Sequence, residues 1–162
     1  LVLKDDDWAL SPTYDMLLGF PGGSLRLSAN DFVRWDRAFA DHELLSPVAE
    51  AELLSPHRAR VPAQLLQQAP TYIGYSYGIN VTCDHEREIH GHLGAVAGFT
   101  SFYARVPADG YVVVVLADTE RFWARSLGKP ILQMLLTGQA ARPGVSDERP
   151  CPTFPPSGAQ QP

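Results

Sequence analysis

Apolar residues between positions 28 and 55 recur with the spacing of a helix. Phe32, Trp35 and Phe39 are spaced three and four residues apart, as on one face of a helix. Ser28 precedes them as a typical cap, and this pattern predicts an amphipathic helix from Ala29 to Asp41. Ser46-Pro47 repeats the start of a helix, with proline in the first turn, and predicts a second, short helix that ends at Ser55-Pro56.

From residue 75 onward, apolar positions alternate with small or polar ones, which is the pattern of a strand. The stretch from Tyr75 to Val81 is predicted to be one half-buried strand. Three further strands are expected at Arg87–Leu93, Gly98–Val106 and Gly110–Asp118. Because the connections are short, with a hairpin turn from Pro107 to Gly110, these strands are predicted to be antiparallel neighbours.

Helical spacing returns between Glu120 and Thr137, with Gly128 and Pro130 as expected irregularities. This helix is predicted to lie on the sheet. Residues 1–23 are expected to be an irregular lead-in, and the proline-rich residues 138–162 a disordered or loosely attached tail. The predicted fold class is therefore α+β over residues 24–137, with an antiparallel sheet, a C-terminal helix packed on it and a small helical segment.

Composition narrows the possible functions. The formal charge of -5 offers no basic surface for a phosphate backbone, so nucleic acid is not an expected partner. No apolar run approaches the roughly 20 residues that a membrane span needs. Cys83 and Cys151 allow at most one disulfide and do not form a zinc-binding pair. The chain begins at Leu1 without a methionine, and we expect it to be a piece of a longer protein.

The most distinctive stretch runs from Ile89 to Ser101 and combines two histidines with glycines between apolar runs. Residues two apart on a strand face the same side, so His90 and His92 are predicted to project together. One interpretation is that these histidines only complete a hydrogen-bond network. Another is a metal site, with His85, His90 and His92 as ligands and Cys83 or Asp84 in support.

The glycines of this stretch suggest a different chemistry. Glycine inside a strand often marks the close approach of a ligand or another backbone, and Gly94 and Gly98 are therefore candidate substrate-binding residues. The N–H of Ala95, just after Gly94, could point at a carbonyl oxygen and stabilise the negative charge that develops there. The simpler alternative is that both glycines form a bulge or a turn between two strands.

The order of these residues resembles a known family. The stretch from His92 to Ser101, followed by Arg105-Val106-Pro107 and Val112–Leu116, is similar to the third conserved block of the serine beta-lactamase and penicillin-recognising superfamily. The match is closest to its D-alanyl-D-alanine carboxypeptidase and esterase branches, where His-x-Gly replaces Lys-Thr-Gly. Upstream, the stretch from Gly22 to Trp35 resembles that family's Gly-Gly segment entering a helix. The resemblance covers residues 22–136 and corresponds to the C-terminal part of a full-length member.

The resemblance implies both a function and a fold. His92, Leu93 and Gly94 would occupy the triplet on the substrate strand, with His92 orienting the substrate and Ala95 donating one oxyanion-hole N–H. The implied reaction is acyl transfer from a peptide, an ester or a beta-lactam through an acyl-enzyme, without a cofactor. The implied fold is an incomplete beta-lactamase/transpeptidase-like one, and the resemblance favours a periplasmic or secreted protein.

One part of the family pattern is missing. The family nucleophile stands in Ser-x-x-Lys at a helix start upstream of these blocks, whereas the match here, Ser126 to Lys129, follows them. The chain alone is therefore expected to be inactive, with the missing N-terminal segment of the domain as a partner that supplies the serine. The alternatives are a non-catalytic remnant that binds a ligand or a partner, and the histidine metal site. An uncovered sheet edge and apolar face are also expected, which would favour self-association.

Overall fold

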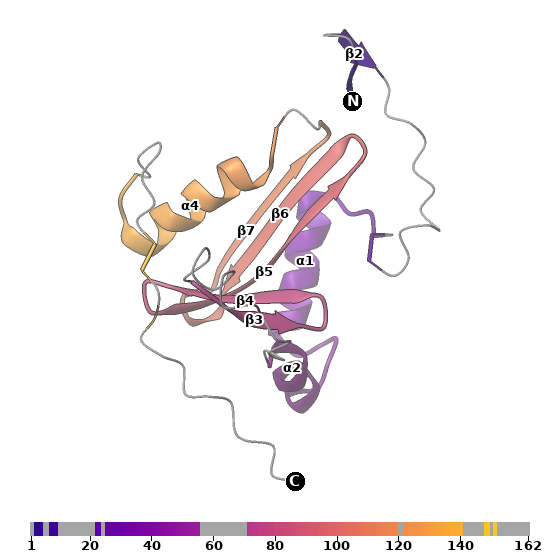
Figure 1. Cartoon of the computed structure of the whole chain (residues 1–162). Helices are drawn as coiled ribbons and strands as arrows, with labels where there is room; N and C mark the ends of the chain where they lie inside the picture. The colour runs from indigo at the N-terminus through magenta and orange to yellow at the C-terminus, as the bar shows by residue number, and fades with distance from the viewer. Residues whose placement is uncertain are drawn as a thin grey trace.

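The computed structural model describes residues 2–4, 7–9, 22–23, 25–55, 71–119, 122–140, 148–149 and 151 (Figure 1). At residues 2–4 and 7–9 it describes the backbone only. These residues form two antiparallel strands, β1 (Val2–Lys4) and β2 (Asp7–Ala9), with Leu3 opposite Trp8. The sequence predicted an irregular lead-in here, because strands of three residues are too short to show an alternating pattern.

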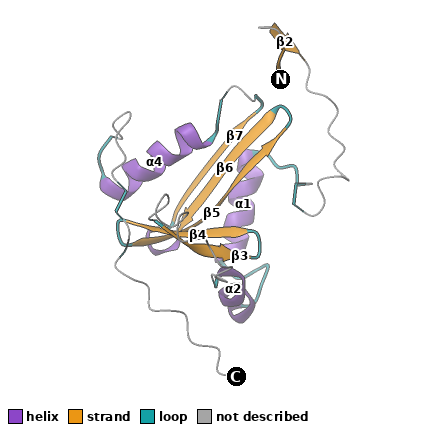
Figure 2. Cartoon of the chain, in the orientation of Figure 1, coloured by secondary structure: helices purple, strands orange, loops and turns teal. Residues whose placement is uncertain are grey.

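A five-stranded antiparallel sheet forms the centre of the fold (Figure 2). Its strands are β3 (Tyr72–Ser76), β4 (Ile79–Asp84), β5 (Arg87–Val96), β6 (Phe99–Val106) and β7 (Tyr111–Ala117). They lie across the sheet in the order of the sequence, and a short 3-10 helix, η1 (Pro107–Asp109), joins β6 to β7. With helix α4 (Arg125–Thr137) after the last strand, this arrangement confirms the predicted α+β class with an antiparallel sheet and a C-terminal helix.

The prediction of a single strand from Tyr75 to Val81 is wrong. The chain turns at Tyr77 and Gly78, and Ser76 lies opposite Ile79 in the hairpin between β3 and β4. Gly78 has a φ of +87°, a left-handed value that few side chains tolerate. The alternation of apolar residues continues through this turn and conceals it, so that only the glycine marks the position where the strand ends.

Helix α4 covers one face of the sheet. The core between them consists of the buried residues Ile89, Phe102, Ala104, Val106, Val113, Ala124 and Leu132. Gly128 permits this packing, because a Cβ there would lie 2.2 Å from Cδ1 of the Phe102 ring. The helix begins at Arg125 and runs without a break past Gly128 and Pro130, where irregularities were expected. Its predicted start at Glu120 lies outside the described residues.

Helices α1 (Ala29–Ala40) and α2 (Pro47–Leu54) begin where the sequence predicted. The side chain of Ser28 accepts a hydrogen bond from the backbone N–H of Asp31 at 3.2 Å, which satisfies one of the free N–H groups at the start of α1. Ser46 caps α2 in the same way, with Pro47 in the first turn.

Helix α1 lies on the face of the sheet opposite α4 (Figure 1). Tyr103 follows Phe102 in β6 and therefore points away from the core beneath α4. Its ring lies 4.8 Å from the Phe32 ring, and its hydroxyl donates a hydrogen bond to Asp36 Oδ1 at 2.7 Å. Arg105, on the same face of β6, lies 3.9 Å from carboxylate oxygens of both Asp36 and Glu50. The buried charges between the helices and the sheet are thus paired, which is the usual condition for burying them.

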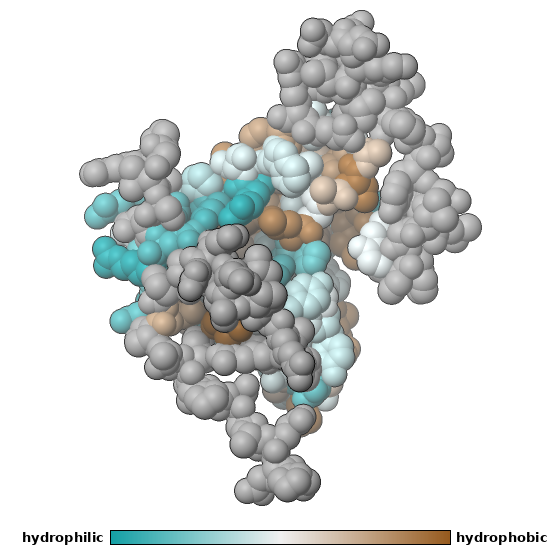
Figure 3. Space-filling view, in the orientation of Figure 1, coloured by the Kyte–Doolittle hydropathy of each residue, from teal (hydrophilic) through white to brown (hydrophobic). Residues whose placement is uncertain are grey.

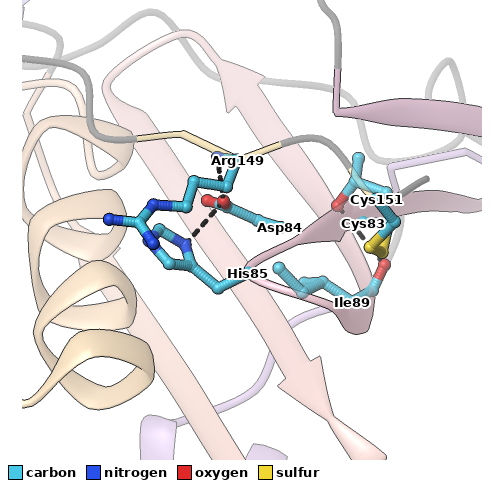
Figure 4. The surroundings of a disulfide bond; sticks show 7 residues. Cys83, Asp84, His85, Ile89, Arg149 and Cys151 are labelled. Atoms are coloured by element: carbon cyan, nitrogen blue, oxygen red, sulfur yellow. Dashed lines mark hydrogen bonds and ion pairs between the residues drawn. A yellow bond between two sulfur atoms is a disulfide. The ribbon is translucent and has the colours of Figure 1, made fainter.

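Part of the C-terminal segment is tied to the β4–β5 turn (Figure 4). A disulfide joins Cys83 to Cys151, with a Cα–Cα distance of 5.6 Å. Asp84 Oδ1 accepts a hydrogen bond from the N–H of Arg149 at 2.7 Å, and the N–H of His85 donates to the Arg149 carbonyl oxygen at 2.9 Å. The sequence predicted a disordered or loosely attached tail over 138–162; at residues 149 and 151 the chain is attached, and most of the remaining tail lies outside the described residues.

Candidate functional site

The candidate site lies where β5 continues beyond β4. The two strands pair from Asp84 opposite Arg87 to Asn80 opposite Gly91, and β5 then runs on to Val96 beside β6. Figure 1 shows β5, β6 and β7 extending past the β3–β4 hairpin. Among the strands that the structure describes, none pairs with residues 92–96 of β5 on the β4 side. This stretch, called the β5 edge below, contains the predicted site residues His92, Leu93, Gly94 and Ala95.

The backbone N–H of Ala95 points away from β6, toward the side on which no described strand pairs with the β5 edge. In an antiparallel ladder, successive residues bond alternately to the strand on one side and the strand on the other. The two-residue turn at Ala97-Gly98 makes Val96 and Phe99 a hydrogen-bonded pair. Gly94 therefore also bonds to β6, and the backbone groups of Ala95 face away from β6.

The turn between β4 and β5, at the other end of β5, independently gives the same alternation of hydrogen-bonding direction along β5. His85 and Glu86 have φ values of 52° and 61°, which define a tight hairpin turn and make Asp84 and Arg87 a hydrogen-bonded pair. Odd-numbered residues of β5 therefore face the β4 side, and β4 does not reach as far as Ala95. A fixed N–H that no neighbouring described strand bonds has the orientation that an oxyanion-hole donor requires.

His92 stands at the start of the β5 edge and contacts a tyrosine from another strand. The distance from His92 Nε2 to the hydroxyl oxygen of Tyr75 is 3.1 Å, and the two ring centroids are 6.0 Å apart. Both side chains are exposed, and Tyr75 belongs to β3, which β4 separates from β5. Tyr75 is not among the site residues predicted from the sequence, because the apolar pattern conceals the turn after β3 that brings this residue near His92. Gly78 is the residue that could have revealed it.

The glycines in and beside the β5 edge occupy their positions for different structural reasons. A Cβ on Gly91 would lie 2.4 Å from the carbonyl oxygen of Tyr103, and one on Gly94 would lie 2.3 Å from Ser101 Oγ. Gly98, with a φ of +81°, forms the turn between β5 and β6. The turn interpretation is therefore correct for Gly98, whereas Gly94 lies in a regular part of the ladder opposite Ser101.

His90 and His92 lie on the same side of β5, but they have different surroundings. The His90 side chain is buried, and its Nε2 lies 2.6 Å from Glu88 Oε1. The interpretation of this histidine as part of a hydrogen-bond network is therefore correct. Of these two histidines, only the exposed His92 is placed to meet a ligand at the β5 edge.

The histidine metal site is not formed. In the part of the chain that the structure describes, there is no group of three histidine, cysteine or acidic side chains that could hold a metal ion. The Cys83 sulfur belongs to the disulfide, and His85 Nδ1 lies 2.7 Å from Asp84 Oδ1 (Figure 4). Three histidines that are close in sequence are therefore divided between the turn, the buried face and the exposed end of one hairpin.

A surface hollow of about 350 Å³ adjoins the far end of the β5 edge. Its lining consists of Ala95, Val96, Ala97, Phe99, Thr100 and Trp123. The Thr100 hydroxyl fixes one wall, because it donates to the Phe122 carbonyl oxygen at 2.7 Å and accepts from the Ala124 N–H at 3.1 Å. Phe99 and Trp123 are more than half exposed, and Figure 3 shows apolar surface at this end of the sheet. Such a hollow, with Ala95 in its lining, suits the hydrocarbon part of a ligand.

The Ser-x-x-Lys match lies on the wrong face of the sheet to serve His92. Ser126 and Lys129 belong to α4, whereas His92 lies opposite Tyr103 on the face that α1 covers. Lys129 forms an ion pair with Glu148, and burial lowers the pKa of Lys129. These contacts connect the lysine to the C-terminal segment and leave no described serine and lysine pair beside the β5 edge.

Tyr103 provides a fixed neighbour for His92 across the β5–β6 ladder. Burial, together with the hydrogen bond to the Asp36 carboxylate, raises the pKa of Tyr103 far above its usual value. The tyrosine therefore stays neutral and keeps donating to Asp36 over the whole physiological pH range. This bond holds α1 beneath the start of the β5 edge.

Comparison of the chain with protein-family models, with curated proteins and with solved structures found no match. The resemblance to the penicillin-recognising superfamily therefore rests on the sequence blocks alone and stays a prediction. Within the described residues, no helix combines the length and the apolar character needed to cross a membrane.

Proposed function

We propose that this chain is the C-terminal portion of a serine hydrolase that acts through an acyl-enzyme. The β5 edge forms one wall of the cleft, where the Ala95 N–H binds the carbonyl oxygen of the acyl group and His92 orients the substrate. Leu93 and Gly94 form the strand surface along which the substrate lies. The serine that attacks the carbonyl carbon comes from a segment upstream of Leu1 or from another chain.

One observation carries this proposal: the Ala95 N–H and the His92 ring both lie on the β5 edge, where no described strand pairs with β5 on the β4 side. Acyl transfer needs donors that are already in place where the carbonyl oxygen becomes negative. A strand edge supplies such a donor without reorganisation, because β6 holds the backbone from the other side. An extended peptide could also pair along this edge, as peptides do with other exposed strands. The substrate class is therefore a small-molecule or peptide acyl group.

Labelling with a fluorescent penicillin or a fluorophosphonate tests this function. The isolated chain should stay unlabelled, because an oxyanion donor without a nucleophile gives little turnover. The protein that includes the segment encoded upstream of Leu1 should be labelled on a serine of that segment. Ser126→Ala is the matched control and should not change the result. Labelling of the isolated chain would contradict this function. No reaction of the longer protein with either probe would contradict the version in which the serine lies upstream of Leu1.

A second candidate is a non-catalytic domain that binds acyl or peptidoglycan-like ligands. The hollow beside Ala95 favours it, because Phe99 and Trp123 present exposed aromatic surface there. Calorimetry with penicillins and with D-Ala-D-Ala peptides separates the two candidates. Binding to the isolated chain without labelling of the longer protein would support the second candidate, and no binding at all would remove it.

A further inference from the structure

The contact between Tyr75 and His92 joins two strands that are not neighbours. Tyr75 lies opposite Asn80, and Asn80 lies opposite Gly91, so that Tyr75 stands in the row of the sheet next to His92. This row is also the last one in which β4 pairs with β5. The tyrosine ring therefore reaches His92 past the end of β4, and its hydroxyl oxygen lies 3.1 Å from Nε2.

The chemistry of the two groups decides which of them donates. A neutral imidazole carries one N–H and one bare nitrogen, and the bare nitrogen is a strong acceptor. A phenol hydroxyl is a better donor than acceptor, because its oxygen lone pairs are partly delocalised into the ring. We propose that Tyr75 donates to Nε2 of neutral His92 and thereby holds the ring in the form that is protonated on Nδ1. Tyr75 is thus a positioning residue. This inference rests on the proposed function only for the role that His92 has in binding the substrate.

This arrangement specifies how His92 meets a ligand. The hydrogen bond at one ring nitrogen of a histidine sets which nitrogen carries the proton. With Nε2 occupied by Tyr75, the ring presents Nδ1–H as a neutral donor. An exposed histidine without a partner would lose rotamer freedom when a substrate binds, whereas His92 is already held by the tyrosine. A neutral donor also suits an uncharged carbonyl or hydroxyl group better than a carboxylate, which binds most strongly to a cation.

Long-range ¹H–¹⁵N correlation NMR on the ¹⁵N-labelled chain of 162 residues measures this form directly. Spectra are recorded at increasing pH until the ring signals stop changing, and these final spectra report the neutral rings. His92→Gln identifies the His92 signals by their loss. We expect a protonated Nδ1 and a bare Nε2 in the wild-type chain. We expect Tyr75→Phe to shift the ring toward the form protonated on Nε2, since the donor at Nε2 is gone.

Tyr77→Phe is the matched control. Tyr77 lies two residues along the same hairpin, and its hydroxyl lies 3.5 Å from Glu52 Oε1. This variant should leave the His92 signals unchanged. A wild-type ring protonated on Nε2, or an Nδ1–H form that persists in Tyr75→Phe, would overturn the proposal. The backbone amide spectrum shows whether each variant is folded. If Tyr75→Phe does not fold, the wild-type spectrum alone decides whether His92 is protonated on Nδ1.

An activity measurement separates this inference from the proposed function. In the longer protein that carries the serine, Tyr75→Phe should lower kcat/KM roughly tenfold, because a less well oriented group costs catalytic rate. Tyr77→Phe should leave kcat/KM unchanged. If the longer protein shows no hydrolase activity while the ring still shifts in Tyr75→Phe, the proposed function fails and the role of Tyr75 stands. An unchanged kcat/KM in Tyr75→Phe would overturn that role in catalysis.

Discussion

The carbonyl oxygen of Tyr103 lies 2.4 Å from the position that a Cβ on Gly91 would occupy. The backbone of β6 approaches β5 so closely at this point that only glycine fits. Gly91 is the last residue of β5 that pairs with β4, and it directly precedes His92. The close contact between β5 and β6 therefore lies at the residue where β5 stops pairing with β4. It holds the backbone in place directly before the β5 edge.

Gly91→Ala should destabilise the fold by about 1–3 kcal/mol, because backbone atoms of β6 must move to admit the methyl group. Urea unfolding measures this free energy. Gly110→Asn is a suitable control, since Gly110 has open space around it and asparagine tolerates its φ of +67°. A Gly91→Ala variant as stable as the wild type would show that the strands can separate here at little cost.

Gly94 should behave differently from Gly91, because a side chain and not the backbone occupies its Cβ position. The atom in the way is Ser101 Oγ, at 2.3 Å. Gly94→Ala alone should lower the free energy of unfolding, and Ser101→Ala should recover about 1 kcal/mol of that loss. A double-mutant cycle of urea unfolding measures the coupling. Strictly additive effects of the two substitutions would contradict this packing.

The sequence predicted the strand that carries His92, because the alternation of residues along a strand is a local property. It ended that strand at Leu93, whereas β5 continues to Val96 and includes Ala95. It did not place Tyr75 beside His92, since that contact depends on a turn at Tyr77-Gly78 that the apolar pattern conceals. The closeness of His85, His90 and His92 in the sequence suggested a shared metal site. Burial and a hairpin turn separate them, and neither is visible in a count of residues between ligands.

Contacts between residues that are far apart in the sequence could not be predicted from local patterns either. The bond between Tyr103 and Asp36 joins residues 67 positions apart, and its formation depends on helix α1 folding back over the sheet. The pairing of Cys83 with Cys151 was left open, because two cysteines show only that a disulfide is allowed. Both contacts join segments that are far apart in the sequence and meet only in the tertiary structure.

Loss of the disulfide should destabilise the fold strongly. The bond spans 68 positions, and closing a loop of that length stabilises the folded state by about 4 kcal/mol in the chain-entropy model. Cys151→Ser should therefore lower the urea midpoint, and a reducing agent should have the same effect on the wild type. The reducing agent should not change the midpoint of Cys151→Ser. A reduced wild type with an unchanged midpoint would show that the bond does not stabilise the fold.

Alkaline pH should weaken the packing of α1 on the sheet. Burial and the Asp36 hydrogen bond raise the pKa of Tyr103 in the folded protein. In the unfolded chain, tyrosine has its usual pKa of about 10. The contribution of Tyr103 to stability is therefore complete below about pH 10 and is lost as the pH rises toward the raised pKa. The free energy of unfolding should fall with pH in this range.

Tyr103→Phe isolates that contribution. The variant should be less stable at neutral pH by about 1–3 kcal/mol, because the Asp36 carboxylate loses its donor. Its stability should also decline less steeply above pH 10 than that of the wild type. Tyr111→Phe, which removes a more exposed hydroxyl, should keep the wild-type slope. Equal slopes for Tyr103→Phe and the wild type would contradict the raised pKa.

The Ala95 N–H is the group on which the proposed function depends most, and proline can remove it alone. Proline lacks the N–H, and it is tolerated at an edge position whose N–H does not bond to a neighbouring strand. Ala95→Val keeps the N–H and serves as the control. The measurement is the rate of fluorophosphonate labelling of the longer protein that carries the serine. We predict that Ala95→Pro labels about 10²–10³ times more slowly than Ala95→Val, and equal labelling rates would contradict an oxyanion hole at the β5 edge.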